Sequence, residues 1–332
     1  MFYKPILIIP GQVNSIFFEI FFKSLKRKKI YSPLILICSV KIFKINAKKY
    51  NFKHNYRLIN SKVDIRNLDN KLLNIIDIEL KINKNKKIQT QYTNDYILKC
   101  FKTAFRILKH KHTYKFLNGP INKETFLKKK FFGITEFITK AFNEVNTGML
   151  IYNKNLSVCP ITTHVPIKSI ANKISKKIIQ NKLKLVNDFY IRNFNFKPRI
   201  GVTGLNPHCE SVSKFNEDEK IILPAIKSAK KNKISAYGPY PADTIFLKQN
   251  RIKFNVILGM YHDQVLTPLK TLYEYDAINI TMGLPFLRVS PDHGPNEKMI
   301  NKNSSNPISL IRALEFLDKN WLKQKKVWVK IF

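Results

Sequence analysis

Short apolar runs recur along the chain, and most of them end at glycine, proline or a cluster of polar residues. Runs of this length that are rich in β-branched residues indicate buried strands. Phe254–Gly259 is the clearest case, because it is apolar throughout and closes on a glycine. On the same criteria we predict strands within residues 6–9, 32–38, 114–118, 156–161, 198–203, 254–259 and 277–288.

Helical signals lie between these runs. We expect a helix from about Asn14, another that opens after Gly133 with Thr135 as its cap, and a third near Pro166, where proline suits the start of a helix. A last amphipathic helix begins near Pro307 and carries one apolar face, formed by Leu310, Ile311, Leu314 and Leu317. The order strand, helix, strand predicts an α/β fold with a parallel sheet. Residues 41–99 show no clear periodicity.

Polar residues that carry chemistry follow three of the predicted strands. His262 and Asp263 come directly after the run at 254–259, His164 follows the run at 156–161, and His208 follows the run at 198–203. A lone histidine is usually structural, but the carboxyl ends of parallel strands meet at one edge of a sheet. Only seven histidines occur in the chain. The recurrence therefore predicts a metal site built from these three imidazoles.

Two carboxylates lie close to these histidines in sequence. Asp243 follows a rigid Gly-Pro-Tyr-Pro loop, and Asp263 is next to His262. They could complete a five-coordinate or octahedral site, orient an imidazole, or, for Asp243, simply cap a helix. Cys209 lies beside His208, but adjacent residues rarely bind one ion and no second cysteine supports a zinc thiolate site.

Two cations suggest an anionic ligand. Arg288 ends an alternating segment and offers a planar donor fork suited to carboxylate or phosphate. Lys123 is expected near a helix start, which is an unusual place for a cation unless an anion lies nearby, although a surface lysine is an equally good interpretation.

The formal net charge of +37 does not by itself indicate nucleic-acid binding. Positive charge comes mostly from lysine, and lysine accompanies abundant Ile, Asn, Phe and Tyr, all of which have AT-rich codons. No nucleic-acid-binding module or clustered basic face is present, so we expect no specific nucleic-acid partner. Four cysteines without Cys-x-x-Cys spacing, a poor signal peptide and no apolar segment of membrane length predict a cytoplasmic protein without a membrane partner.

Taken together, several segments resemble the 4-hydroxythreonine-4-phosphate dehydrogenase family of vitamin B6 (pyridoxal phosphate) biosynthesis. They cover much of residues 115–295 in order, and their combination is specific. The matching segments are Asn118-Gly119-Pro120-Ile121-Asn122-Lys123, Gly133 to Phe137, Thr162-Thr163-His164, Gly204-Leu205-Asn206-Pro207-His208, Gly238 to Phe246, Met260 to Lys270 and Asn279 to Gly294.

The resemblance implies two α/β/α subdomains flanking a cleft, similar to isocitrate and isopropylmalate dehydrogenases. We expect residues 1–125 with 290–332 to form the first subdomain, on the cofactor side. Residues 126–289 would form the second, on the metal and dimer side. The family works as a homodimer with a shared active site.

The same resemblance implies roles for individual residues. His164, His208 and His262 would bind a divalent metal (zinc, magnesium or cobalt), with histidines from both subunits. Asp243, Asp263 and Lys270 would take part in catalysis, Lys270 either in proton transfer or on the substrate phosphate. The implied substrate contacts are Thr135, Lys270, Asn279 and Arg288, and the implied cofactor contacts are Asp292, His293 and Gly294.

The implied reaction is the NAD- or NADP-dependent oxidation of 4-phosphooxy-L-threonine to 2-amino-3-oxo-4-phosphooxybutanoate, which decarboxylates to 3-amino-2-oxopropyl phosphate. The cation would acidify the alcohol, and the nicotinamide would accept the hydride. No Gly-x-Gly-x-x-Gly fingerprint occurs, which argues against an ordinary Rossmann cofactor site.

Three segments depart from the family pattern. Ile134 stands where the family usually has a histidine, Gly11 to Ser15 replaces a Gly-Asp-Pro-x-Gly pattern, and Pro295-Asn296 follows His293-Gly294 where the family has Thr-Ala. Three alternatives therefore stay open: a paralogous dehydrogenase of another phosphorylated hydroxy acid, a metal-dependent hydrolase or lyase, and a basic nucleic-acid-binding protein with structural histidines.

Overall fold

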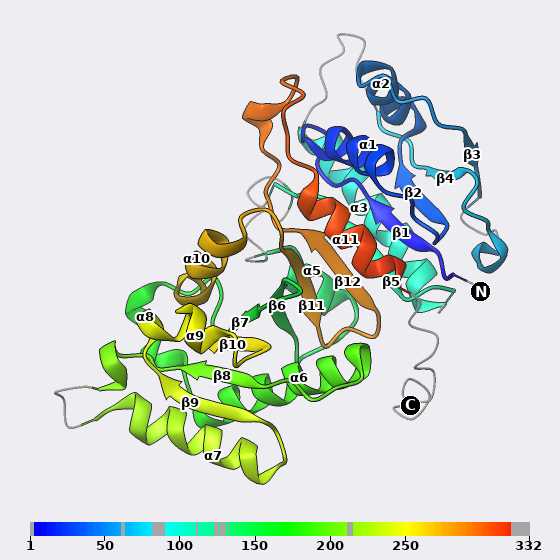
Figure 1. Ribbon diagram of the computed structural model, residues 1–332. Helices are drawn as coiled ribbons and strands as arrows, with labels where there is room; N and C mark the ends of the chain where they lie inside the picture. Colours follow the sequence, from blue (N-terminus) through cyan, green and yellow to red (C-terminus); the bar gives the residue numbers. More distant parts are fainter. Residues whose placement is uncertain are drawn as a thin grey trace. The chain divides into compact units, whose positions relative to one another are not determined.

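The computed structural model of the protein describes residues 3–60, 64–81, 90–110, 112–122, 126, 131, 133–210 and 215–319. The described residues form two compact units (Figure 1). Unit 1 contains the described residues up to Phe142 and those from Leu284 onward, and unit 2 contains Asn143–Gly283. Each unit is a parallel or mostly parallel sheet with helices on its faces.

Unit 1 is built on six parallel strands in the order β3-β4-β2-β1-β5-β12. Its strands are β1 (Ile6–Ile9), β2 (Leu34–Cys38), β3 (Tyr56–Leu58), β4 (Leu73–Asp77), β5 (Lys115–Asn118) and β12 (Leu287–Pro291). Its helices are α1 (Phe17–Arg27), α2 (Val40–Lys49), α3 (Thr90–Lys109), α5 (Ile134–Ala141) and α11 (Ile308–Asp318), with short 3-10 turns at Ile65–Asn67 and Glu297–Met299.

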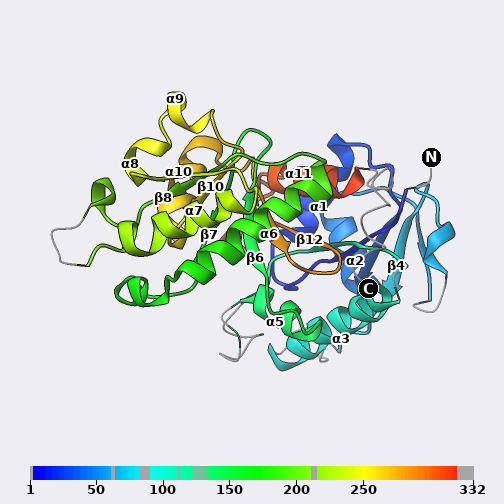
Figure 2. The same cartoon turned by 90° about the horizontal axis from the view of Figure 1, so that it is seen from below.

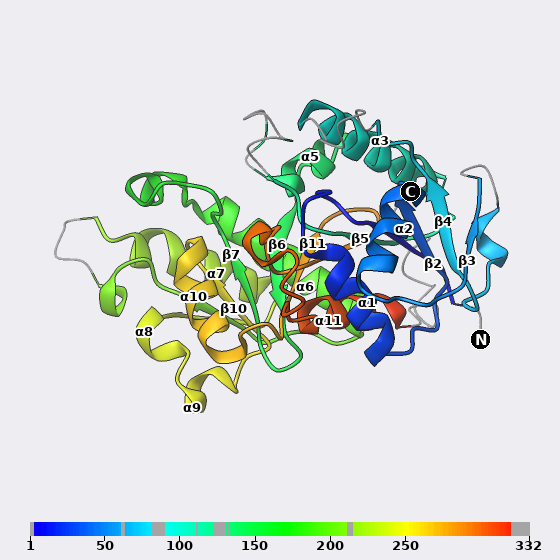
Figure 3. The same cartoon turned by 90° about the horizontal axis from the view of Figure 1, so that it is seen from above.

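The central strands of unit 1 are buried on both faces, which explains their continuous apolar runs. Every residue of β1 and β2 is buried, as a strand covered by helices on both sides requires. Helices α1 and α11 pack together on one face of the sheet and α3 covers the other (Figures 2 and 3). Phenylalanines dominate the packing, for example Phe17 stacked on Phe21 with ring centroids 5.6 Å apart.

Unit 2 has the strand order β11-β6-β7-β10-β8-β9. Strands β7, β10, β8 and β9 are parallel, whereas β6 runs antiparallel to both β7 and β11. The strands are β6 (Gly148–Tyr152), β7 (Ser157–Pro160), β8 (Ile200–Thr203), β9 (Ala236–Tyr240), β10 (Val256–Gly259) and β11 (Ile278–Met282).

The helices of unit 2 cover both faces of its sheet. They are α6 (Lys176–Phe194), α7 (Leu223–Lys231), α8 (Ala242–Ile245), α9 (Lys248–Arg251) and α10 (His262–Tyr273), with a π-helical turn at Asp218–Ile222 and 3-10 turns at Ile167–Ser169, Ala171–Lys173 and Pro207–Cys209. One core lies under α8 and α10, where Ile245 and Leu269 meet Val158 and Ile257 of the sheet. Helices α6 and α7 contact each other on the opposite face (Figures 1 and 2).

The predicted α/β class with parallel strands is confirmed. Three predicted helix starts are wrong in detail. Directly after Pro166 only the 3-10 turn at Ile167–Ser169 forms, and α6 begins at Lys176. Helix α1 begins at Phe17 rather than near Asn14, and the Phe17 amide donates to the Ser15 hydroxyl at 3.3 Å. Helix α5 begins at Ile134 with Gly133 at its cap position and no side-chain cap, so Thr135 lies within the first turn. The Thr135 hydroxyl instead contacts an arginine, described below.

Within the described part of the chain, no helix combines the length and the apolar character needed to span a bilayer.

Candidate active site

The carboxyl edge of the unit 2 sheet carries four of the residues predicted from sequence. His164 follows β7, His262 follows β10, His208 follows β8 and Asp243 follows β9. These four strands are adjacent and parallel, so their carboxyl ends share one edge, where α/β proteins place their ligands. The expectation that separate strand ends deliver the three histidines to one edge agrees with this topology.

His164 and His262 form a pair at this edge. Their ring centroids lie 6.3 Å apart with an interplanar angle of 31°, somewhat more than the roughly 5 Å expected for two imidazoles on one tetrahedral zinc ion. Asp263 holds the second ring, with its Oδ1 2.6 Å from His262 Nδ1. The side chains of His262 and Asp263 are 39% and 78% exposed, so both are accessible to a ligand. Because Nδ1 of His262 contacts Asp263, the Nε2 atom of His262 is the ring nitrogen left for coordination.

His208 lies in a different group. It occupies a short turn at Pro207–Cys209 with a left-handed backbone (φ 56°). Burial raises the pKa of the neighbouring Cys209 thiol to about 11, and the Asp218 and Asp243 carboxylates contribute to the increase. Asp243 thus lies within electrostatic range of the His208 turn.

The metal expectation fits a single copy of the chain only in part. Among the described residues, no three His, Cys, Asp or Glu side chains are grouped closely enough to hold a metal ion. The chain presents a His164–His262 pair and, separately, the His208 turn with Asp243. The described residues of one copy therefore do not assemble the predicted three-histidine site.

A buried amide connects the loops after β8 and β10. Gln264 Oε1 accepts hydrogen bonds from the Met260 amide at 2.7 Å and the Thr203 hydroxyl at 2.8 Å, and its Nε2 donates to the Gly204 carbonyl at 2.8 Å. The Thr162 hydroxyl donates to the Met260 carbonyl at 2.8 Å. The loops after β7, β10 and β8 are thus tied together. Sequence reasoning gave Gln264 no role, although it directly follows the His-Asp pair.

Lys270 and Asn279 occupy other places in unit 2. Lys270 is in the last turn of α10, roughly 12 Å along the helix axis from His262 at 1.5 Å per residue. Asn279 lies on β11, opposite Ile151 of β6, and its buried Oδ1 has no hydrogen-bond partner. One copy of unit 2 therefore does not place Lys270 beside the histidine pair.

Arg288 is the centre of a polar group in unit 1. Its side chain belongs to β12, is only 1% exposed, and donates from Nε to Asn118 Oδ1 at 2.8 Å. Its Nη1 lies 3.4 Å from the Thr135 hydroxyl. Burial lowers the pKa of Arg288 to about 10, while the nearby Glu136 carboxylate acts in the opposite direction. The guanidinium therefore remains charged at neutral pH.

Two residues that the resemblance assigns to the substrate, Thr135 and Arg288, are thus within hydrogen-bonding distance of each other. Asn118 and Glu136 complete the group, and sequence reasoning gave neither a role. Asn118 and Glu136 both lie inside the segments that match the family. Their polar side chains within those segments were the sequence feature that could have marked them as site residues. Lys123, the other cation predicted to lie near an anion, is outside the described residues.

The carboxyl ends of β1, β5 and β12 meet at one edge of the unit 1 sheet. Backbones approach closely here: a Cβ at Gly119 would lie 2.1 Å from the Pro10 carbonyl oxygen, so only glycine fits. The buried Oε1 of Gln12, after β1, has no hydrogen-bond partner. An orphaned buried acceptor at such an edge is what a bound amide or amino group would satisfy.

The predicted cofactor residues Asp292, His293 and Gly294 directly follow β12 at this edge. The Asp292 amide donates to the Ser309 hydroxyl of α11 at 2.9 Å. His293 Nδ1 lies 2.9 Å from the Gly294 carbonyl. A Cβ at Gly294 would meet nothing within 4 Å, so this turn is open. The open turn and the orphaned Gln12 oxygen fit a nicotinamide cofactor at this edge.

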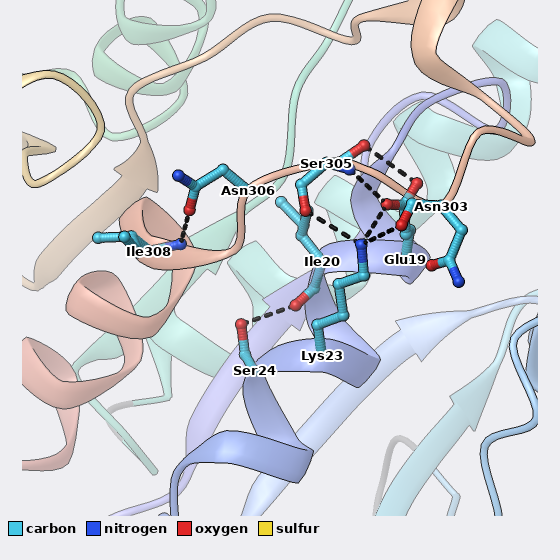
Figure 4. A network of polar contacts seen from close by, with 8 residues as sticks. All are labelled: Glu19, Ile20, Lys23, Ser24, Asn303, Ser305, Asn306 and Ile308. Atoms are coloured by element: carbon cyan, nitrogen blue, oxygen red, sulfur yellow. Dashed lines mark hydrogen bonds and ion pairs between the residues drawn. The ribbon is translucent and has the colours of Figure 1, made fainter.

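An ion-pair network anchors the segment that continues from this turn (Figure 4). Glu19 of α1 is 1% exposed and accepts from Lys23 Nζ at 2.7 Å, from the Ser305 amide at 2.7 Å and from the Ser305 hydroxyl at 3.0 Å. Lys23 also donates to the carbonyls of Asn303 and Ser305. Closer to the turn, the Ile16 amide donates to the Pro295 carbonyl. The connection between β12 and α11 is therefore bound both to α1 and to Ile16, the residue that precedes this helix.

Comparisons with known proteins agree with the resemblance. Residues 29–317 match the family model described as "Pyridoxal phosphate biosynthetic protein PdxA". A 4-hydroxythreonine-4-phosphate dehydrogenase from Sulfurihydrogenibium sp. is 33% identical over 312 residues, which is 92% of this chain and 94% of that protein. A D-threonate 4-phosphate dehydrogenase from Salmonella typhimurium is 30% identical and covers 88% of this chain and 91% of its own length.

A solved structure shows the same fold. The crystal structure of 4-hydroxythreonine-4-phosphate dehydrogenase from Klebsiella pneumoniae aligns with a TM-score of 0.79 and 25% sequence identity, covering 95% of this chain and 98% of that one. Sequence and fold agree over nearly the whole length. The chain therefore belongs to the PdxA family of oxidoreductases, which includes the 4-hydroxythreonine-4-phosphate and D-threonate 4-phosphate dehydrogenases.

Proposed function

We propose that the chain oxidises 4-phosphooxy-L-threonine with NAD or NADP to 2-amino-3-oxo-4-phosphooxybutanoate. Loss of carbon dioxide then gives 3-amino-2-oxopropyl phosphate, in a cytoplasmic pathway to vitamin B6. The family assignment and the name of the Sulfurihydrogenibium relative support this reaction.

The buried Arg288 group is the observation that carries the proposal. Arg288 is 1% exposed and stays charged at neutral pH, so it is a strong donor whose position the fold determines. Asn118 and Thr135 hold its donors in position, and guanidinium geometry suits carboxylate and phosphate. In this role Arg288 binds an acidic group of the substrate, and Thr135 contributes its hydroxyl to the same contact.

His164, His262 and His208 would hold a divalent cation, which we propose to be zinc, magnesium or cobalt. When bound, the cation supplies the Lewis acidity that lowers the pKa of the substrate alcohol. Asp263 keeps the His262 ring oriented through the 2.6 Å contact. Because one copy does not group all three histidines, we propose a homodimer in which the two copies share the ligands. Asp243 and Lys270 would act in proton transfer or on the phosphate of that shared site.

Asp292, His293 and Gly294 would contact the nicotinamide cofactor at the edge of unit 1, with the Gln12 Oε1 as an acceptor for its amide group. The fixed segment after the turn, held by Glu19, limits movement of this loop. The protein thus supplies placement, while the cofactor accepts the hydride.

Turnover assays on purified protein would test the proposal. The enzyme is stripped with chelator, resupplied with zinc, magnesium or cobalt, and given 4-phosphooxy-L-threonine with NAD or NADP. We expect reduced nicotinamide to form only when substrate, metal and cofactor are all present. Product formation without nicotinamide would instead support a hydrolase or lyase, and no reduction under any combination would refute the proposal.

Metal content measured against oligomeric state would test the shared site. We expect one tightly bound cation per subunit in the dimer and weaker binding when the protein is diluted to monomer. Equal affinity in monomer and dimer would contradict sharing of ligands between copies.

A paralogous activity on D-threonate 4-phosphate is the second candidate. It is favoured by the 30% identity to the Salmonella relative of that name and by Ile134, which removes one polar contact beside Thr135. The same assay with D-threonate 4-phosphate as substrate separates the two activities.

A further inference from the structure

Glu136 is the polar residue beside Arg288 that the proposed reaction does not yet use. It lies in the first turn of α5, next to Thr135. Its Oε2 is completely buried and has no hydrogen-bond partner. Its charge nevertheless acts on the Arg288 guanidinium. A carboxylate and a guanidinium are therefore close enough to interact electrostatically, while Glu136 Oε2 accepts no hydrogen bond from Arg288.

A buried anionic oxygen without a donor is unfavourable, so it indicates a partner that the protein does not itself supply. The first turn of α5 has the sequence Ile-Thr-Glu-Phe. With Ile134 in place of the family histidine, Thr135 and Glu136 are its polar side chains. The Thr135 hydroxyl is engaged with Arg288. The unsatisfied acceptor of this turn is therefore the Glu136 carboxylate.

The pair of opposite charges matches one kind of substrate. An α-amino acid carries an ammonium group and a carboxylate on the same carbon, and Arg288 is suited to the carboxylate. An ammonium group offers three donors and a full positive charge. A 2-hydroxy acid such as D-threonate 4-phosphate offers a neutral hydroxyl at that carbon, which makes a weaker hydrogen bond to a carboxylate.

We propose that Glu136 accepts a hydrogen bond from the substrate's ammonium group and thereby selects a phosphorylated α-amino acid over the corresponding hydroxy acid. This inference rests on the proposed dehydrogenase function and names the group that decides between its two candidate substrates. The difference between a charge-assisted and a neutral hydrogen bond predicts a preference of about tenfold.

The test compares 4-phosphooxy-L-threonine with D-threonate 4-phosphate, for both turnover and calorimetric binding, in the wild type and in Glu136→Gln. Glutamine keeps the shape but removes the negative charge. We expect kcat/KM for the amino acid to fall at least tenfold, while kcat/KM for the hydroxy acid stays within about threefold. Glu136→Asp keeps the charge and should retain the amino acid preference. The KM for the nicotinamide should not change.

Glu79→Gln is the matched control, because Glu79 is exposed in the same unit and its replacement removes the same charge. Thermal unfolding of each variant checks that the fold is intact. An equal loss on both substrates, no change on either, or a wild type that prefers the hydroxy acid would each overturn the role of Glu136. A wild type that neither binds nor oxidises either substrate would overturn the proposed function itself.

Discussion

Replacing Gln264 by leucine should destabilise unit 2 through the loops that follow β8 and β10. The substitution keeps most of the side-chain volume but removes hydrogen bonds to the Met260 amide, the Thr203 hydroxyl and the Gly204 carbonyl. These three residues are buried, so water does not replace the lost partners. An unsatisfied buried group costs about 1–3 kcal/mol. We therefore expect the free energy of unfolding to fall by about 3 kcal/mol or more.

Thr203→Val separates the contributions. Valine has the shape of threonine and removes only the hydroxyl, and Gln264 Oε1 still accepts from the Met260 amide. The expected loss is therefore about 1 kcal/mol. Gln249→Leu is the control for the chemical change alone, because Gln249 is exposed on α9, and it should stay within about 0.5 kcal/mol of the wild type.

Urea unfolding followed by far-UV circular dichroism measures these differences, and hydrogen exchange at the Met260 amide reports the loop directly. We expect that amide to exchange faster in Gln264→Leu and only slightly faster in Thr203→Val. A Gln264→Leu protein that unfolds within 1 kcal/mol of the wild type, with a protected Met260 amide, would refute the argument that the amide holds the two loops.

Three further predictions follow from single contacts. Burial lowers the pKa of Lys115 from 10.5 to about 8. Between these two pH values Lys115 is protonated in the unfolded chain but not in the folded one, so the free energy of unfolding should rise with pH, by up to roughly 3 kcal/mol. Unfolding measured across this pH range should show a smaller rise in Lys115→Met. Arg288→Lys loses the fork that reaches Asn118 and Thr135, so kcat/KM should fall about tenfold to a hundredfold without a change in the KM for nicotinamide in steady-state assays. Asp263→Asn removes the charged partner of His262, so zinc affinity should fall about tenfold in a chelator competition.

Each of these has a contrary outcome. A Lys115→Met protein with the same pH dependence as the wild type would show that another group causes the rise. A wild-type kcat/KM in Arg288→Lys would show that substrate binding does not depend on the planar geometry of the arginine guanidinium. Unchanged zinc affinity in Asp263→Asn would mean that the Asp263–His262 contact does not contribute to metal binding.

Much of the sheet could be predicted from the sequence because its strands are short, apolar and closed by turn residues. Fully buried strands such as β1 and β10 must be apolar on both faces, so their positions are visible without a partner strand. Residues 41–99 gave no such signal, although nearly all of α2, the strands β3 and β4 and the first half of α3 lie there. β3 is partly exposed and α2 is lysine-rich, so neither has a clean apolar period.

For the site, the sequence by itself determined which residue types follow which strand. The histidines lie directly after β7, β8 and β10, and ligand-binding residues of parallel α/β sheets usually follow the carboxyl ends of the strands. Only the tertiary structure decided that His262 pairs with His164 rather than with His208. It also brought Arg288 to Asn118 and Thr135, 170 and 153 residues away in sequence. The local pattern of apolar residues determines where a strand ends. The contacts of a side chain depend instead on the order of the strands and on the path of the loop that carries it, and local periodicity predicts neither.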